Sequence, residues 1–180
     1  MKAFLLIAFI CSFTLRLFGQ ENAIVWNETQ PLQWFDFAGP INDSSRFDAE
    51  SFAEVKYNYQ FNNARDFYFD VFANFNKNIS WCKKEYRTQA LLKHEQIHFD
   101  IAALYAKKLK EAFNNYHYSK DYKKEILQIF NQKRTEYHFM QQQYDEETNH
   151  SLNKVRQKDW EKFITEELNE LKFKFNYVKK

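Results

Sequence analysis

The sequence predicts an α+β fold, in which a small antiparallel N-terminal sheet packs on a helical part of the chain. Two observations lead to this prediction. In the first half, apolar and polar residues alternate with a period of two, whereas in the second half apolar residues recur at helical spacing. Strands followed by helices, without regular alternation of the two, favour the α+β class over a parallel α/β sheet.

The N-terminus predicts a secretory signal peptide. A basic start precedes an apolar run, residues 3–15, and the small Gly19 marks a cleavage site. Cys11 could instead mark a lipoprotein, but bulky residues precede it where small ones are expected. We therefore expect residues 1–19 to be removed and residues 20–180 to form one domain, exported to the periplasm or the extracellular space.

Composition argues against some classes of partner. Loss of Lys2 and Arg16 with the signal peptide brings the 26 basic residues level with the 24 acidic ones, so the formal net charge falls from +2 to zero. A neutral chain has no net basic field to attract nucleic acid or anionic lipid. We also expect no stable membrane span after cleavage. Cys82 then has no cysteine partner within the chain, and a buried apolar role is expected for it.

The first half predicts four strands. Residues 23–26 and 32–37 look like two short strands around a turn, and residues 39–45 form a loop. Strict alternation follows in residues 52–61 and again in residues 67–75. Because a short Asn-rich turn separates these two runs, they predict an antiparallel hairpin.

The second half predicts three helices. After a connection over residues 76–82, the first helix runs from Glu85 to about Asn114. A second long helix begins near Tyr122, and the polar residues 145–151 break or bend it. The third helix extends from about residue 152 into the 170s.

The pattern H-E-x-x-H occurs at residues 94–98, within the first predicted helix. His94 and His98 are one turn apart on a helix and therefore lie on one face, where both imidazoles can bind one zinc ion. Glu95 then lies beside the open coordination position as a general base. The stripe that carries both histidines is otherwise apolar, and an unpartnered imidazole there would lose hydration. Its other members are Leu91, Ile101, Ala102, Tyr105 and Leu109.

A catalytic zinc site needs a third protein ligand. The extended metzincin pattern is absent, because Leu104 stands where its third histidine would be. The remaining candidates include Asp145, His150 and nearby glutamates. His117 and His138 are the weaker candidates, since a loop rich in tyrosine and a polar helix face are both solvated settings. Residue type and position favour His150 over Asp145, because an irregular junction between helices can present a ligand.

Paired blocks carry a resemblance to a known family. The first reads His94-Glu95-Gln96-Ile97-His98-Phe99-Asp100, and the second reads Tyr144-Asp145-Glu146-Glu147-Thr148-Asn149-His150. Together with Trp26, the residues 32–37 and Trp160, they resemble a bacterial family of predicted secreted zinc-dependent proteases, known as domain of unknown function 922. The resemblance extends over essentially the whole chain after the signal peptide.

The resemblance implies roles for individual residues. It implies that the second block serves the same site, through His150 as third ligand. Gly is expected after that histidine, and this chain has Ser151. Ser can cap the next helix, so we expect the change to be tolerated; if a positive φ were required there, the placement of His150 would shift. Asp100 and Asp145 are candidates to orient a ligand imidazole, and Tyr144 could stabilise an oxyanion or belong to the core.

The function that these observations favour is that of a secreted zinc-dependent metallopeptidase, with Zn²⁺ held by His94, His98 and His150. Glu95 is the expected catalytic base, and the expected substrate is a polypeptide of unknown identity. Residues 67–75 could lie along the cleft and pair with it. The alternative is a non-catalytic metal-binding or peptide-binding domain of the same fold. A third reading, an aromatic-rich structural domain with an incidental motif, conflicts with the apolar setting of both histidines.

Overall fold

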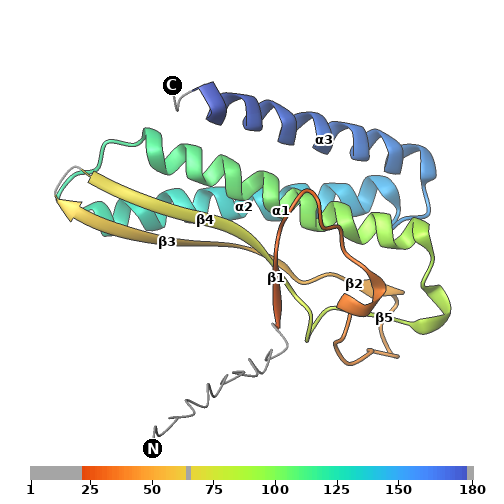
Figure 1. The fold of residues 1–180 in the computed structure, drawn as a ribbon. Helices are drawn as coiled ribbons and strands as arrows, with labels where there is room; N and C mark the ends of the chain where they lie inside the picture. The colour runs from red at the N-terminus through yellow and green to blue at the C-terminus, as the bar shows by residue number, and fades with distance from the viewer. Residues whose placement is uncertain (1–21, 64–65, 178–180) are drawn as a thin grey trace, which may run out of the picture.

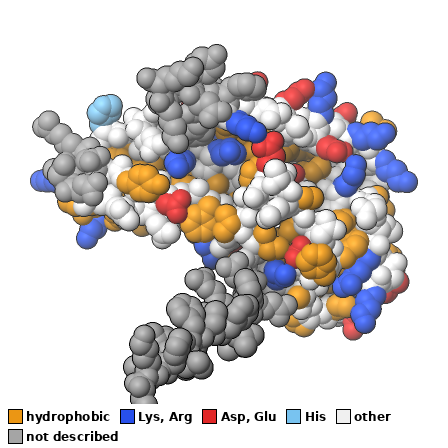
Figure 2. Space-filling model, viewed as in Figure 1, with side chains coloured by type: hydrophobic (Ala, Val, Ile, Leu, Met, Phe, Trp, Pro, Cys, Tyr) orange, Lys and Arg blue, Asp and Glu red, His pale blue; other side chains and the backbone are white. Residues whose placement is uncertain are grey.

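The computed structural model describes residues 22–63 and 66–177. The predicted signal peptide, residues 1–19, lies outside the described residues. Within them, no helix has the length and apolar character needed to cross a membrane. On the face in Figure 2, basic side chains stand beside acidic ones.

A three-stranded antiparallel sheet forms the first part of the fold. Its long hairpin consists of β3 (Ala53–Asn63) and β4 (Asp66–Asn76), and β1 (Ala23–Val25) pairs with the other edge of β4. In this register Tyr57 lies opposite Val71, and Ile24 lies opposite Phe75. The predicted hairpin and the first predicted strand are therefore confirmed.

Three long helices follow, and they lie together on one face of the hairpin (Figure 1). They are α1 (Gln89–Asn115), α2 (Tyr122–Thr148) and α3 (Lys154–Tyr177). Thr88 begins α1, because its side-chain oxygen accepts a hydrogen bond from the Leu91 amide at 3.2 Å. Helix α1 packs against β4 and against both other helices. The α+β class predicted from the sequence is thus confirmed.

The core lies along α1. Ile101, Ala102 and Leu109 have no exposed surface, as the predicted apolar stripe requires. At the far end of the hairpin, Phe69 of β4 stacks on Phe113 of α1 with ring centroids 4.4 Å apart. These contacts hold the sheet against α1 and thereby keep α1 in a single orientation.

Residues 32–37 are not a strand, contrary to the prediction. They contain a short 3₁₀ helix, η1 (Trp34–Asp36). The buried Asp36 carboxylate accepts a hydrogen bond from the Gln33 amide at 2.9 Å and lies 3.0 Å from Lys77 Nζ. A side chain that binds the backbone three residues earlier stabilises a turn and competes with the extended conformation.

A second small sheet was missed by the sequence analysis. It pairs β2 (Ala49–Glu50) with β5 (Trp81–Cys82), which falls inside the expected connection before the first helix. A second 3₁₀ helix, η2 (Lys84–Tyr86), then leads to α1. Strands of two residues have no detectable periodicity, so alternation could not reveal them.

Helix α2 ends at Thr148, within the predicted break at residues 145–151. Three successive residues then have positive φ: Asn149 at 46°, His150 at 49° and Ser151 at 78°. The amide of His150 donates to the main-chain oxygen of Asp145 at 3.0 Å, which closes the end of the helix. This left-handed segment turns the chain so that α3 returns over α1. Ser151 therefore occupies the backbone conformation that favours the glycine expected at that position.

We predict that Phe69→Ala lowers the free energy of unfolding by about 3–5 kcal/mol, because it leaves a cavity beside Phe113. Phe69 is only 2% exposed, whereas its neighbour Tyr68 is 58% exposed on the opposite face of β4. Tyr68→Ala is the matched control and should change stability by less than about 1 kcal/mol. Urea denaturation of both variants measures the difference, and equal effects would contradict the packing described.

We predict that Ser151→Gly raises the free energy of unfolding by about 0.5–1 kcal/mol, because it removes the cost of a positive φ at a residue with a Cβ. The control is Ser44→Gly in the loop before β2, where φ is not positive. There the added backbone freedom should lower stability slightly. Thermal and urea denaturation compare the two; destabilisation by Ser151→Gly would show that Ser151 makes a stabilising contact.

Candidate metal centre

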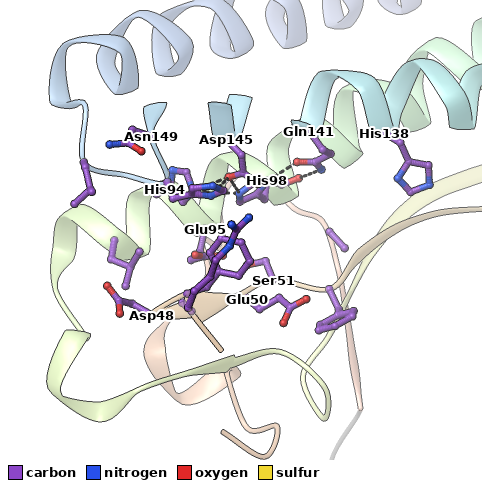
Figure 3. A pocket seen from close by; sticks show the side chains of 18 of the residues that line it. Asp48, Glu50, Ser51, His94, Glu95, His98, His138, Gln141, Asp145 and Asn149 are labelled. Carbon is purple, nitrogen blue, oxygen red and sulfur yellow. Dashed lines mark hydrogen bonds and ion pairs between the residues drawn. The ribbon is translucent and has the colours of Figure 1, made fainter. Parts of the chain in front are cut away.

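His94 and His98 project from one face of α1 toward Asp145 of α2 (Figure 3). Their Nε2 atoms are 3.2 Å apart. The Oδ1 atom of Asp145 lies 3.2 Å from Nε2 of His94 and 3.0 Å from Nε2 of His98. Two helices therefore bring three ligand atoms together at nearly equal spacing.

Burial and charge set the protonation of this cluster. Burial alone would lower the pKa of His98, but the hydrogen bond that His98 donates to Asp145 and the negative charge of Asp145 outweigh burial and raise that pKa to about 9. Burial would likewise raise the pKa of Asp145, yet hydrogen bonds from His94 and His98 hold it well below its usual range. Asp145 is therefore an anion that attracts a positive charge to the point where the three atoms meet.

The outer nitrogen of each imidazole contacts a glutamine. Nδ1 of His98 lies 2.5 Å from Oε1 of Gln141, on α2. Nδ1 of His94 lies 3.1 Å from Oε1 of Gln157, on α3. An amide oxygen can only accept a hydrogen bond, so this arrangement suits a proton on each Nδ1, while each Nε2 faces Asp145.

The ring of Tyr144 packs against both imidazoles. Its ring stacks on His94, with centroids 4.7 Å apart and an interplanar angle of 22°, and meets His98 edge-on at 4.9 Å. The hydroxyl lies 3.2 Å from the main-chain oxygen of His94 and contacts Gln157. Tyr144 is fully buried and does not line the cleft, so it belongs to the core and not to an oxyanion site.

The cluster opens into a cleft of about 640 Å³. Helices α1 and α2 form one wall, and the segment of residues 46–53 around β2 forms the other. Glu95 is only 3% exposed, yet it lines this cleft beside the two histidines (Figure 3). A carboxylate thus stands next to the three ligand atoms on the side that a substrate could reach.

The residues present fit a zinc ion. Ligand atoms at about 2.0–2.1 Å from a tetrahedral zinc lie roughly 3.3 Å from one another, close to the 3.0–3.2 Å found here. Two imidazole nitrogens and one carboxylate oxygen form a donor set typical of catalytic zinc. These three residues are also the group within the described chain whose ligand atoms come close enough to share an ion.

His150, the third ligand expected from the family resemblance, lies at the edge of the cluster. Its Nδ1 is 3.4 Å from Oδ1 of Asp145, and its ring packs against Phe47 at 4.7 Å. The side chain is 42% exposed, and the compact three-atom group contains Asp145 in its place. The role of His150 as a ligand stays a prediction. Of the weaker candidates, His138 lines the cleft farther out and His117 does not line it.

Asp100 does not orient an imidazole. Its Oδ1 accepts hydrogen bonds from the indole of Trp26 at 2.7 Å and from the amide of Gln96 at 2.8 Å. Oε1 of Gln96 in turn accepts from the main-chain amide of Leu32 at 2.7 Å. The first block of the resemblance therefore has two roles. His94 and His98 face the cleft, whereas Gln96 and Asp100 bind the segment that contains Trp26 and Leu32 to another side of α1.

The expectation that residues 67–75 lie along the cleft is wrong. These residues belong to β4, which is the middle strand of its sheet, paired with β1 and β3 on its two edges. Both edges are occupied, so β4 cannot receive a further strand where these partners pair with it. Residues 46–53 form one wall of the cleft, and of these the sequence analysis assigned only residues 52 and 53, to the predicted hairpin.

Sequence analysis also missed the two glutamines that contact the imidazoles. Gln141 precedes Asp145 by one helical turn, so a search for polar residues on that face of α2 could have found it. Gln157 has no such signal, because it stands in a different helix, 63 positions after His94. Its role depends entirely on the return of α3 over α1.

A family model described as "Bacterial protein of unknown function (DUF922)" matches residues 75–151. The match includes both blocks that carry the resemblance, and with them His94, Glu95, His98 and Asp145. It ends before α3 and its Gln157. No curated protein and no solved structure matches the chain. The comparison supports the family resemblance, and its description assigns no activity.

Proposed function

We propose that this protein is an exported zinc-dependent metallopeptidase. The observation that carries the proposal is the convergence of His94, His98 and Asp145 at 3.0–3.2 Å, with Glu95 beside them in an open cleft. A purely structural metal site has no need of a buried carboxylate next to its accessible side. Export follows from the predicted signal peptide and places the substrate outside the cytoplasm.

In this proposal the zinc ligands are Nε2 of His94, Nε2 of His98 and Oδ1 of Asp145. The residues fit this role by spacing, by donor type and by the anionic state of Asp145. His150 is the alternative third ligand, because its Nδ1 is 3.4 Å from the same oxygen. Bound zinc supplies a Lewis acid that makes water acidic and polarises a carbonyl group.

Glu95 is the proposed catalytic base. It follows His94 directly on α1 and faces the cleft. Its carboxylate accepts a proton from the attacking water and delivers that proton to the leaving amine, which balances the hydrolysis of a peptide bond. Glu95 is only 3% exposed, so its carboxylate has little contact with bulk solvent.

The cleft wall suits an extended polypeptide. The Lys83 amide donates to the oxygen of Asp48 at 2.9 Å, and the Phe52 amide donates to Ser80 Oγ at 2.9 Å, so the main chain at residues 48, 50 and 52 faces β5. By alternation, the main-chain groups of Ala49 and Ser51 face the opposite side. Both residues line the cleft. We propose that the substrate adds a strand along this edge.

We predict that the mature protein binds one zinc ion per chain and that Asp145→Ala lowers the affinity at least 100-fold, because it removes the anionic ligand. His150→Ala should lower it less than 10-fold. Elemental analysis and competition with a chelator measure both. The reverse order of effects would make His150 the third ligand, and absence of zinc uptake by the wild type would overturn the proposal.

We predict that Glu95→Gln lowers peptidase activity by about 10²–10⁴-fold on an unfolded protein substrate, because the amide cannot accept the proton of water. Its zinc content should remain that of the wild type. Glu85→Gln, in the exposed η2 turn before α1, is the matched control and should leave the rate unchanged. A protein that binds zinc but whose activity is unaffected by Glu95→Gln would be a metal-binding module without turnover.

A further inference from the structure

We propose that Gln141 and Gln157 are positioning residues, which hold the Nδ1 protons of His98 and His94 and so direct both Nε2 lone pairs to a common point beside Asp145. This inference concerns the orientation and tautomer of the imidazoles. Its consequence for zinc rests on the proposed function. Neither glutamine is part of the H-E-x-x-H pattern, and Gln157 lies outside the matched family segment.

Gln141 has only one possible orientation of its amide. Its Nε2 donates to the main-chain oxygen of His98 at 2.9 Å, which places Oε1 against Nδ1 of the same residue at 2.5 Å. One side chain of α2 thus binds His98 at both its backbone and its ring. Rotation of the imidazole would break the ring contact while the backbone contact keeps Gln141 in place, so His98 has one preferred orientation.

Gln157 is oriented through Tyr144. The Tyr144 hydroxyl lies 3.2 Å from the main-chain oxygen of His94, to which it donates its hydrogen. Both ends of the Gln157 amide lie near this hydroxyl, Nε2 at 2.8 Å and Oε1 at 3.0 Å. With Nε2 donating to the hydroxyl, Oε1 accepts from Nδ1 of His94 at 3.1 Å. The stacked ring of Tyr144 also prevents the imidazole from tilting.

The two glutamines oppose an effect of Asp145. A carboxylate 3.0–3.2 Å from both Nε2 atoms favours a proton on each of them, and a proton there occupies the direction in which a metal must bind. When an imidazole carries a single proton, a hydrogen-bond acceptor beside Nδ1 keeps that proton on Nδ1 and leaves Nε2 unprotonated. The imidazoles can then bind a cation without first exchanging tautomers.

Helix α3 therefore contributes directly to the site. Its position is held by Trp160, whose indole donates to Glu147 at 2.9 Å, and by the pair of Lys108 and Glu167 at 2.9 Å. Because Gln157 lies on the same helix, correct docking of α3 is a condition for the orientation of His94. The matched family segment alone would lack this contact.

The test uses the full mature chain with Gln141→Leu, Gln157→Leu and the corresponding glutamate variants, which keep an acceptor oxygen. The matched control is Gln142→Leu, because Gln142 is exposed on α2 and bonds to Glu146. Nitrogen-15 NMR of the histidine side chains reports which ring nitrogen carries the proton. Competition with a chelator reports zinc affinity.

In the metal-free wild type and the control, at a pH where each ring carries a single proton, we expect that proton on Nδ1 of His94 and of His98. Each leucine variant should lose the protected Nδ1 proton of its own histidine and bind zinc about 10–100-fold more weakly, whereas the glutamate variants should retain both properties. Unprotonated Nδ1 atoms in the wild type, or leucine variants with wild-type tautomers and affinity, would overturn the inference. If the wild type binds no zinc, the proposed function fails. The NMR result still decides whether Gln141 and Gln157 position the two imidazoles.

Discussion

The packing of Tyr144 between α1 and α2 is the contact on which the rest of the site depends. Its ring lies against both imidazoles, and its hydroxyl binds the backbone of His94. A buried aromatic ring has few alternative positions in a close-packed interior, so it fixes the spacing between the two helices. That spacing in turn brings Asp145, the next residue on α2, within 3.2 Å of both Nε2 atoms.

The turn after α2 brings the third helix to the metal centre. Three residues with positive φ reverse the chain, and α3 then returns over α1 with Gln157 above His94. Backbone strain of this kind persists only where the surrounding structure supports it, and it is concentrated at functional sites. Here the strained residues include His150, which contacts Asp145, and Ser151, where a glycine would meet no such cost. The unfavourable backbone conformation of residues 149–151 thus accompanies the placement of His150 and Gln157 beside the metal centre.

Much of the fold could be predicted from the chain. Alternation over residues 52–61 and 67–75 revealed β3 and β4, because each strand has one face toward α1 and the other toward solvent. Helical spacing revealed α1, since its apolar stripe is long and regular. Residues 32–37 misled the analysis, because their apolar content suggested a strand while Asp36 stabilises a turn. The two-residue strands β2 and β5 gave no periodic signal, so the cleft wall that contains β2 was missed.

For the candidate site, the sequence by itself determined the pair His94 and His98 and the adjacent Glu95, because helical geometry fixes the relation of residues one turn apart. It also indicated the block of residues 144–150 as the source of a further ligand. Only the tertiary structure decided that Asp145 enters the compact cluster while His150 lies at its edge. It also decided that Gln141 and Gln157 contact the rings. The physical reason is that local spacing specifies one face of one helix, whereas contacts between helices depend on packing and on the turn that joins α2 to α3.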